Sequence, residues 1–331
     1  MMYTWVVSFL CAGASVAPGT AAALRPSSAA AQVAALDPDE STDIDPPGWV
    51  KLEHFQDVQV EEYRTLHPEN GRVVLIGTRT LAGVAHGPEW SYWPNGAPRI
   101  QRVWVDGHMQ GPYKAWFTSG MRRLEGLMKN DGRDGPWHRY SEKSHLTSLS
   151  EYQDGVPHGA FREFYASGKD KSERHFDKGV QVGVEARWSG KGKPEFEAHW
   201  EAGELHGPWK RMALAKGPAG PQGTYSHGKR EGIWIEVTHK GVTISEVAYV
   251  DGVMEGVRKT WRADGTLATE AYQEHGKETG PFSAYHVNGN RQMTGEKVDG
   301  QREGMWTYWK ADGSPEPVFS GTYENDVKVA D

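Results

Sequence analysis

Short runs of alternating apolar and polar residues fill the chain from about residue 58 onward, and each run ends at a glycine turn. The segment 280–303, GPFSAYHVNGNRQMTGEKVDGQRE, shows the unit: an aromatic run at 281–287, then Asn288-Gly289, then a return run at 291–298. Alternation with a period of two is typical of half-buried strands, and Asn-Gly between two such runs predicts a two-residue hairpin turn. Each unit is therefore predicted to be a β-hairpin.

The unit repeats along the chain. Equivalent glycines recur every 24 residues, with one step of 25, and we call them the anchor glycines: Gly87, Gly111, Gly135, Gly159, Gly183, Gly207, Gly232, Gly256, Gly280 and Gly304. A second glycine lies four residues before nine of the ten, and a third follows most of them by nine residues. Glycine suits tight turns because it adopts φ > 0 without strain. The period predicts an all-β fold, an elongated antiparallel single-sheet solenoid of about ten stacked hairpins.

Two aromatic columns accompany the glycines. The first lies two residues after the anchors, at Tyr113, Trp137, Phe161, Trp209, Trp234, Phe282 and Trp306. The second lies five residues after them, at Tyr92, Trp116, Tyr140, Phe164, Trp188, Trp261, Tyr285 and Trp309. Strand side chains alternate faces, so this spacing puts the columns on opposite faces unless a bulge intervenes, and the sequence leaves that choice open. We interpret the columns mainly as the core of a thin sheet, with a binding platform as the alternative.

The chain before the array is predicted to contain three segments. Residues 1–34 hold an apolar run followed by small residues, as export signals do, although no Lys or Arg precedes the run; a disordered alanine-rich leader is the alternative. Residues 35–48 form an acidic, proline-containing linker. Residues 49–82 predict a degenerate capping hairpin, and 83–331 hold the array with a partial return strand at 318–323.

The leader also sets the expected location. The apolar run is too short for a stable transmembrane span, so we expect export to the periplasm, the envelope or the medium, or a cytoplasmic protein if the leader is not a signal. Cys11 is the only cysteine. Lipid attachment at Cys11 remains an option, but Leu10 before it fits poorly, because lipoprotein signals place a small residue there.

Composition narrows the function. Glycine (40 residues) and tryptophan (14) are plentiful and aliphatic residues are sparse, which fits a thin, turn-rich array better than an enzyme with a thick core. A net charge of −7 without a basic patch argues against nucleic acid. The chain has no nucleotide-binding loop, zinc motif or nucleophile motif, so we predict no catalytic residues, no cofactor and no metal.

Some residues break the pattern or suggest chemistry. His86, His158 and His206 directly precede anchor glycines, but stacking would separate neighbouring units by about 10 Å, too far to share an ion. The third unit has Ser144 at a turn glycine position, the fifth has Glu185 in the first column, and the sixth has a longer loop at 215–223. Such departures can mark a binding face, with relaxed sequence at tolerant turns as the alternative.

The repeated pattern G-x-x-x-G-P-W-x-x-Y/W-x-x-x-G, seen at 107–120 and 276–289, resembles the MORN repeat family. It is most similar to the bacterial variant in YwqK-type antitoxin proteins. The resemblance covers most of the chain and implies antiparallel hairpins stacked into a twisted single sheet. It also implies an interaction scaffold and, for the YwqK type, neutralisation of a partner toxin by binding.

The sequence therefore predicts a non-enzymatic scaffold that binds a protein partner of unknown identity through a broad sheet face, with an antitoxin-like or immunity-like role. The alternative is an exported, envelope-associated module that binds a glycan or membrane surface through exposed aromatic rings. The candidate contact residues are the aromatic residues outside the two columns: Trp93, Trp104, Phe117 and Trp200.

Overall fold

The computed structural model describes residues 58–212 and 220–331. By the contacts between its Cα atoms the chain divides into two units, Met1–Pro47 and Gly48–Asp331, and the described residues all belong to the second. The predictions for the leader at 1–34, for Cys11 and for the linker at 35–48 lie outside the described residues.

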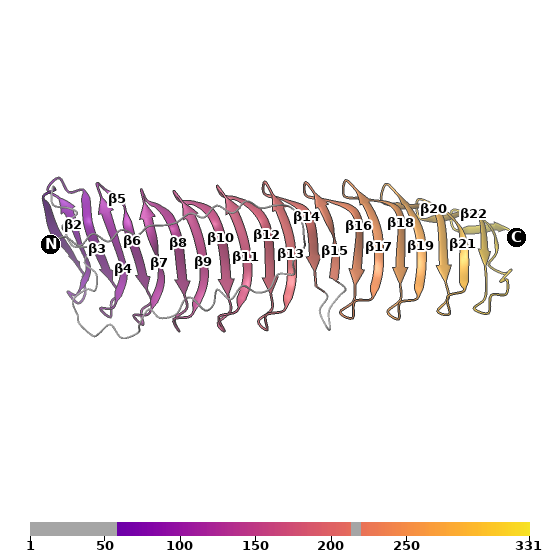
Figure 1. Cartoon of the computed structure of the whole chain (residues 1–331), viewed down its shortest axis with the longest axis horizontal. Helices are drawn as coiled ribbons and strands as arrows, with labels where there is room; N and C mark the ends of the chain where they lie inside the picture. The colour runs from indigo at the N-terminus through magenta and orange to yellow at the C-terminus, as the bar shows by residue number, and fades with distance from the viewer. Residues whose placement is uncertain (1–57, 213–219) are drawn as a thin grey trace, which may run out of the picture. The chain divides into compact units, whose positions relative to one another are not determined.

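The described residues form an all-β fold. Twenty-four antiparallel strands make one open sheet, and these residues contain no helix and so none that could cross a membrane. Figure 1 shows the strands side by side in chain order. The first twelve are β1 (Val60–Leu66), β2 (Val73–Thr80), β3 (Ala85–Tyr92), β4 (Pro98–Val105), β5 (His108–Met109), β6 (Gly111–Trp116), β7 (Arg122–Lys129), β8 (Gly132–Tyr140), β9 (Leu146–Gln153), β10 (Val156–Phe164), β11 (Asp170–Asp177) and β12 (Val180–Trp188). The others are β13 (Pro194–Glu201), β14 (Glu204–Arg211), β15 (Gly220–Ser226), β16 (Lys229–Val237), β17 (Thr243–Val250), β18 (Val253–Trp261), β19 (Leu267–Glu274), β20 (Lys277–Tyr285), β21 (Arg291–Val298), β22 (Gln301–Tyr308), β23 (Gly321–Glu324) and β24 (Val327–Ala330).

Each strand pairs with the next one along the chain, apart from the short β5, which continues into β6 beside β4. At the N-terminal end β1 pairs with β2, and β2 pairs with β3. At the other end, the expected return strand at 318–323 begins later, at Gly321, and β24 follows it. Residues 317–319 form a turn, in which the Ser320 N–H and hydroxyl both donate to the Glu316 carbonyl, and this explains the late start.

Two kinds of turn join the strands. At one end of the strands the turns have two residues, both with positive φ, as at Asp251 (51°) and Gly252 (85°). This is the primed hairpin turn, whose twist matches that of the strands. It occurs where the sequence has Asp-Gly and also where Ala202 or His227 precedes the glycine.

The turns at the opposite end of the strands differ from the prediction. Asn288-Gly289 was expected to be a two-residue turn, and this expectation is wrong. His286 N–H donates to the Asn290 carbonyl and Gly289 N–H to the His286 carbonyl, so three residues form the loop, and only Gly289 has positive φ (85°). The ladder already ends at Tyr285 and Arg291, and the Asn288 side chain accepts a bond from Asn290 N–H, which favours the longer loop.

The anchor glycines lie in bulges inside the strands. Between β7 and β8, Glu125 pairs with His138 and Leu127 with Asp134, so Gly126 alone faces the three residues 135–137. The same shift recurs at the later pairs up to β21–β22. All ten anchor glycines have positive φ, from 66° at Gly135 to 113° at Gly280, which explains why glycine stands there.

The two aromatic columns lie on opposite faces. Trp137, of the first column, packs on Gly126, while Tyr140, of the second, donates a hydrogen bond to the neighbouring Glu125. Adjacent strand residues point to opposite faces, so we call the face of Trp137 the first face and that of Tyr140 the second face. Trp137, Trp234 and Trp306 are 2%, 3% and 1% exposed, and the core of this one-layer sheet therefore lies on the first face.

Candidate binding faces

The first face is held together by tryptophan rings that lie on glycines. A Cβ added to Gly126, Gly223 or Gly295 would lie 2.4 Å from the indole of Trp137, Trp234 or Trp306. Each of these tryptophans lies eleven residues after its glycine, and each indole N–H donates to a carbonyl of the same neighbouring strand at 3.0–3.1 Å. These glycines belong to none of the three glycine rows seen in the sequence. The constant spacing of eleven residues to a tryptophan is the signal that could have found them.

Arginine side chains cover two of these rings from the other side. Arg133 lies 4.5 Å from the centre of the Trp137 ring, and Arg230 lies 4.3 Å from that of Trp234. Each also donates a hydrogen bond to a tyrosine of the next strand, Tyr152 or Tyr249, at 3.1 and 3.0 Å. Such cation–π contacts contribute about 0.5–2 kcal/mol each. The rings are thus enclosed between a glycine and a guanidinium, and their faces are not open to a ligand.

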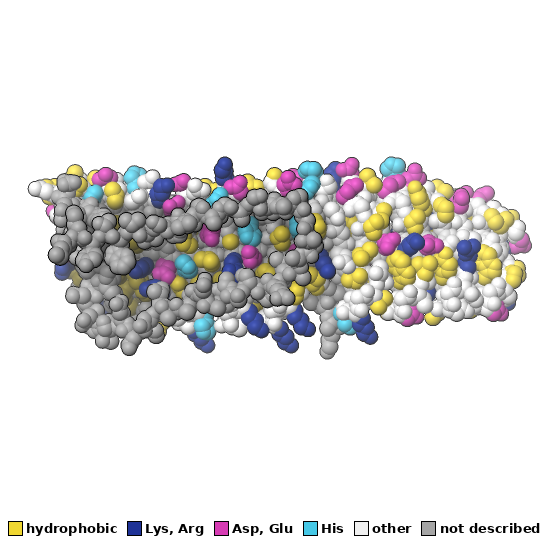
Figure 2. Space-filling model, viewed as in Figure 1, with side chains coloured by type: hydrophobic (Ala, Val, Ile, Leu, Met, Phe, Trp, Pro, Cys, Tyr) yellow, Lys and Arg dark blue, Asp and Glu magenta, His cyan; other side chains and the backbone are white. Residues whose placement is uncertain are grey.

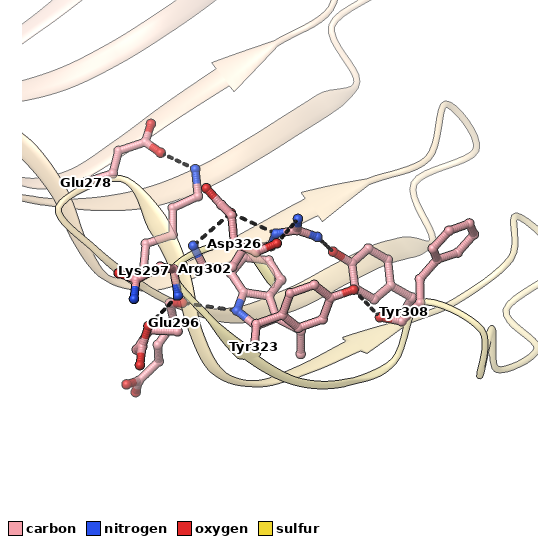
Figure 3. A network of polar contacts seen from close by, with 11 residues as sticks. Glu278, Glu296, Lys297, Arg302, Tyr308, Tyr323 and Asp326 are labelled. Atoms are coloured by element: carbon pink, nitrogen blue, oxygen red, sulfur yellow. Dashed lines mark hydrogen bonds and ion pairs between the residues drawn. The ribbon is translucent and has the colours of Figure 1, made fainter. Parts of the chain in front are cut away.

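The equivalent arginine at the C-terminal end, Arg302, organises the polar network of Figure 3. Its Nε donates to Asp326 Oδ1 at 2.9 Å and its Nη1 to the Tyr308 hydroxyl at 2.9 Å, while its guanidinium lies 4.2 Å from the Tyr323 ring. Hydrogen bonds from the Arg302 backbone N–H and side chain lower the pKa of Asp326. Because Asp326 lies between β23 and β24, this network fastens the last two strands to β22.

Trp93 and Phe117, two predicted contact residues, lie at equivalent loop positions and are half-buried. The Trp93 indole N–H donates to the Trp116 carbonyl of the next unit at 3.2 Å, with Arg99 over its ring. Tyr165 makes the same bond to the Trp188 carbonyl at 2.8 Å. This loop position therefore ties some hairpins to the next one, whereas Phe117 has no polar side-chain atom to make the bond.

Trp104 and Trp200, the other two, lie opposite anchor glycines, paired with Gly87 and Gly183. Both are half-buried. The Trp200 indole N–H donates to Glu185 at 3.0 Å, and Glu185, although only 3% exposed, also accepts bonds from Gln181 and Arg187. The acid that replaces a ring of the first column is therefore fully hydrogen-bonded. The structure does not bring the four candidate residues together in one patch.

The second face carries an exposed apolar row that the sequence analysis missed. Ile233, Val257 and Met305, each directly after an anchor glycine, are 56%, 47% and 62% exposed. Val257 pairs directly with Tyr272, whose Cβ lies only 3.4 Å from the position of a Cβ added to Gly280. We call Ile233, Val257, Tyr272 and Met305 the apolar row. It crosses β16 to β22, roughly 30 Å at the usual spacing of strands.

Beside the apolar row, the second face holds hydrogen-bonded charges. Lys259 pairs with Glu270 at 3.2 Å, and the Tyr285 hydroxyl donates to the same carboxylate at 2.8 Å. The bond from Tyr285, with the Lys259 bond and charge, lowers the pKa of Glu270. Burial, together with the bond to Glu125, raises the pKa of Tyr140 to about 12. Figure 2 shows hydrophobic and charged side chains gathered in rows on one face of the C-terminal strands.

The first face is hollowed over β8 to β11. The hollow has a volume of about 580 Å³, and its lining includes Trp137, Arg139, Ser148, Ser150, Phe161 and Arg174. Lys171 and Glu163 form an ion pair of 3.2 Å at its side. Burial raises the pKa of Glu163, but hydrogen bonds from Lys171 and Ser172 and the charges of Lys171 and Arg174 outweigh it, so that the pKa is lowered.

The histidines before the anchor glycines lie within β3, β10 and β14, and two of them face acids. His86 and His158 lie 3.2 and 3.3 Å from Asp106 and Asp177, and His206 packs against His227 with ring centres 4.8 Å apart. No group of three or more His, Cys, Asp or Glu side chains that could hold a metal ion occurs within residues 58–212 and 220–331.

Comparison with known proteins identifies no family. No protein-family model and no curated protein matches the chain. The crystal structure of TcdB2-TccC3 is 10% identical over 74% of this chain, with a TM-score of 0.19, and that of TcdB2-TccC3-Cdc42 has the same identity and coverage with 0.18. The crystal structure of TcdB2-TccC3-TEV is 12% identical over 77%, with 0.17. The chain spans 14–16% of the length of these proteins, and TM-scores this low do not establish a shared fold.

Proposed function

We propose that this chain is a non-enzymatic scaffold of about ten stacked MORN-like hairpin repeats that binds a partner protein through the second face of its sheet. The observation that carries the proposal is the apolar row. Ile233, Val257 and Met305 are 47–62% exposed, whereas Trp234 and Trp306, the neighbours of Ile233 and Met305, are buried. Val257 and Tyr272 are directly paired on this face, and exposed apolar side chains rimmed by polar residues are typical of protein interaction sites.

The composition of the row supports a protein as the partner. Tyr272 presents an exposed ring next to Val257, and tyrosine is among the residues that contribute most to protein interfaces. The Lys259–Glu270 pair, beside the row, supplies the polar rim that interfaces usually have. The resemblance to YwqK-type antitoxin proteins adds a specific role within this proposal, the neutralisation of a toxin by binding it. Export, with the action outside the cytoplasm, remains part of the same proposal.

Site-specific photo-crosslinking in the native host tests the proposal. A photoreactive side chain at position 257 or 305 is expected to capture one protein reproducibly, identified by mass spectrometry. The same group at Asp312, in an exposed loop away from the row, serves as the control. Equal capture at all three positions, or no capture at 257 and 305, would contradict the proposal.

The alternative, glycan or membrane binding through exposed rings, has less support. The fifteen rings of the two columns are buried or half-buried. In the described part of the chain only the rings of Tyr272 and Phe319 are exposed. Two rings on different parts of the sheet do not make the stacking platform that this alternative requires, so protein binding is the function that the geometry supports better.

A further inference from the structure

The hollow on the first face exists because small side chains form its floor. Ser148 pairs with Arg139 on one side and Glu163 on the other. Ser150 pairs with Trp137 and Phe161 in the same way. Each serine is therefore flanked by two larger residues of the neighbouring strands. Directly paired residues share a face, so the larger side chains form walls around two hydroxyl groups.

The walls carry positive charge. Arg174 pairs directly with Phe161, and Arg139 is exposed on β8. Neither arginine forms an ion pair with any described residue. Lys171 adds a third cation, and Glu163 is the acid that faces the hollow. The hollow is thus locally basic in a chain whose net charge is −7.

The equivalent place over β16 to β19 shows that the charge is not a feature of every unit. Arg230, Trp234 and Tyr249 reproduce the contacts of Arg133, Trp137 and Tyr152. There, however, Glu236 stands where β8 has Arg139, the buried Val247 replaces Ser150, and Ala271 replaces Arg174. Ser245 still stands where β9 has Ser148, and Arg258 stands where β10 has Phe161. The scaffold contacts recur, while the arginines of positions 139 and 174 and the serine of position 150 do not.

We propose that this hollow binds carboxylate side chains of an acidic, extended segment of a partner protein. Arginine forms paired hydrogen bonds with carboxylates, and the serine hydroxyls can donate to a second oxygen. A shallow hollow of about 580 Å³ accommodates side chains that project from a segment crossing the sheet face. The inference rests on the proposed function, because its ligand is part of a protein, but it uses the opposite face of the sheet.

Fluorescence anisotropy with the full chain tests the proposal. The probe is a fluorescein-labelled peptide of four Glu-Gly repeats, and the matched peptide of four Gln-Gly repeats is the control. We expect the acidic peptide to bind and the neutral one not to bind. Arg139→Gln/Arg174→Gln is expected to weaken binding at least tenfold, and Arg211→Gln/Arg291→Gln, with the same loss of charge elsewhere, by less than twofold.

A third variant separates shape from charge. Ser150→Leu fills the floor between Trp137 and Phe161 and keeps every arginine, so it is expected to weaken binding at least tenfold as well. Circular dichroism and thermal unfolding would verify that each variant is folded.

Three results would overturn the inference: no binding of the acidic peptide, equal weakening by the two arginine pairs, or binding of an oligogalacturonate in place of the peptide. The last would assign the hollow to acidic glycans. If the peptide fails to bind while crosslinking at positions 257 and 305 persists, only the hollow loses its assignment.

Discussion

A missing Cβ determines how closely a tryptophan can approach the neighbouring strand. Gly126, Gly223 and Gly295 have ordinary backbone angles, so no turn requires a glycine there. They are required because the indole occupies the place of the side chain. Elsewhere the same position holds alanine, as at Ala271, which faces the smaller Phe282. Glycine therefore goes with tryptophan at this pair of positions, and alanine goes with phenylalanine.

Gly295→Ala is predicted to destabilise the fold by about 1–3 kcal/mol, because its Cβ would lie 2.4 Å from the Trp306 ring. Chemical denaturation would measure the change in the free energy of unfolding. Gly190→Ala is the control, since its Cβ would meet no atom closer than 3.8 Å. Adding Trp306→Phe to Gly295→Ala recreates the natural Ala271–Phe282 pair and is expected to recover part of the loss. A destabilisation equal to that of Gly190→Ala would refute the contact.

Burial raises the pKa of Tyr140 to about 12, with a further contribution from the hydrogen bond that its hydroxyl donates to Glu125. A raised pKa means that the stabilisation by neutral Tyr140 is complete below about pH 10 and is lost as the pH rises toward 12. Ultraviolet titration of phenolate absorbance, compared between the wild type and Tyr140→Phe, measures this. If the variant lacks a step near pH 10 instead of near pH 12, the account of this residue is wrong.

At the scale of strands and turns, much of the fold could be predicted from the sequence. The alternation of apolar and polar residues predicted antiparallel hairpins, and two of the three glycine rows marked the turns, whereas the anchor glycines lie in bulges. The bulges could not be derived, because they depend on the register between strands and not on one strand alone. The same is true of the hollow and the apolar row, since Ser150 and Tyr272 acquire their surroundings from residues of neighbouring strands. The four predicted contact residues were chosen by type, and the structure places them half-buried within and between the hairpins.

Gly256→Val is predicted to disturb the bulge in β18. Gly256 has φ of 88°, where a β-branched residue is strained by about 1–3 kcal/mol. Its added Cβ would meet nothing closer than 3.9 Å, so the cost comes from the backbone and not from a clash. Thermal unfolding is expected to occur at a lower temperature. Unchanged unfolding would show that the backbone at this bulge is not constrained as described.

Ala202→Asn is predicted to stabilise the protein by up to about 1 kcal/mol. Ala202 has φ of 49° at the first position of a two-residue turn, and asparagine tolerates this region better than alanine. Equivalent turns use aspartate, as at Asp251. Denaturant unfolding would measure the gain, with Ala160→Asn, in a strand, as a control expected to show none. A loss of stability in Ala202→Asn would contradict the turn assignment.

At the scale of all the described residues, contacts join each strand mainly to its immediate neighbours in the open sheet. A one-layer sheet has no second layer to cover its faces. On the first face, tryptophan rings are covered within the sheet itself, because they lie between a glycine of the neighbouring strand and an arginine side chain. The second face leaves the apolar row exposed, and the proposed function follows from this difference between the faces.

The affinity of the chain for the protein captured by crosslinking tests this account most directly. Val257→Asp/Met305→Asp places two charges in the apolar row, and Ser119→Asp/Ser167→Asp places two in exposed loops where equivalent units already have aspartate. Isothermal titration calorimetry is expected to show at least tenfold weaker binding for the first pair and unchanged binding for the second. Equal affinities for the two pairs, with both variants folded, would contradict binding through the second face.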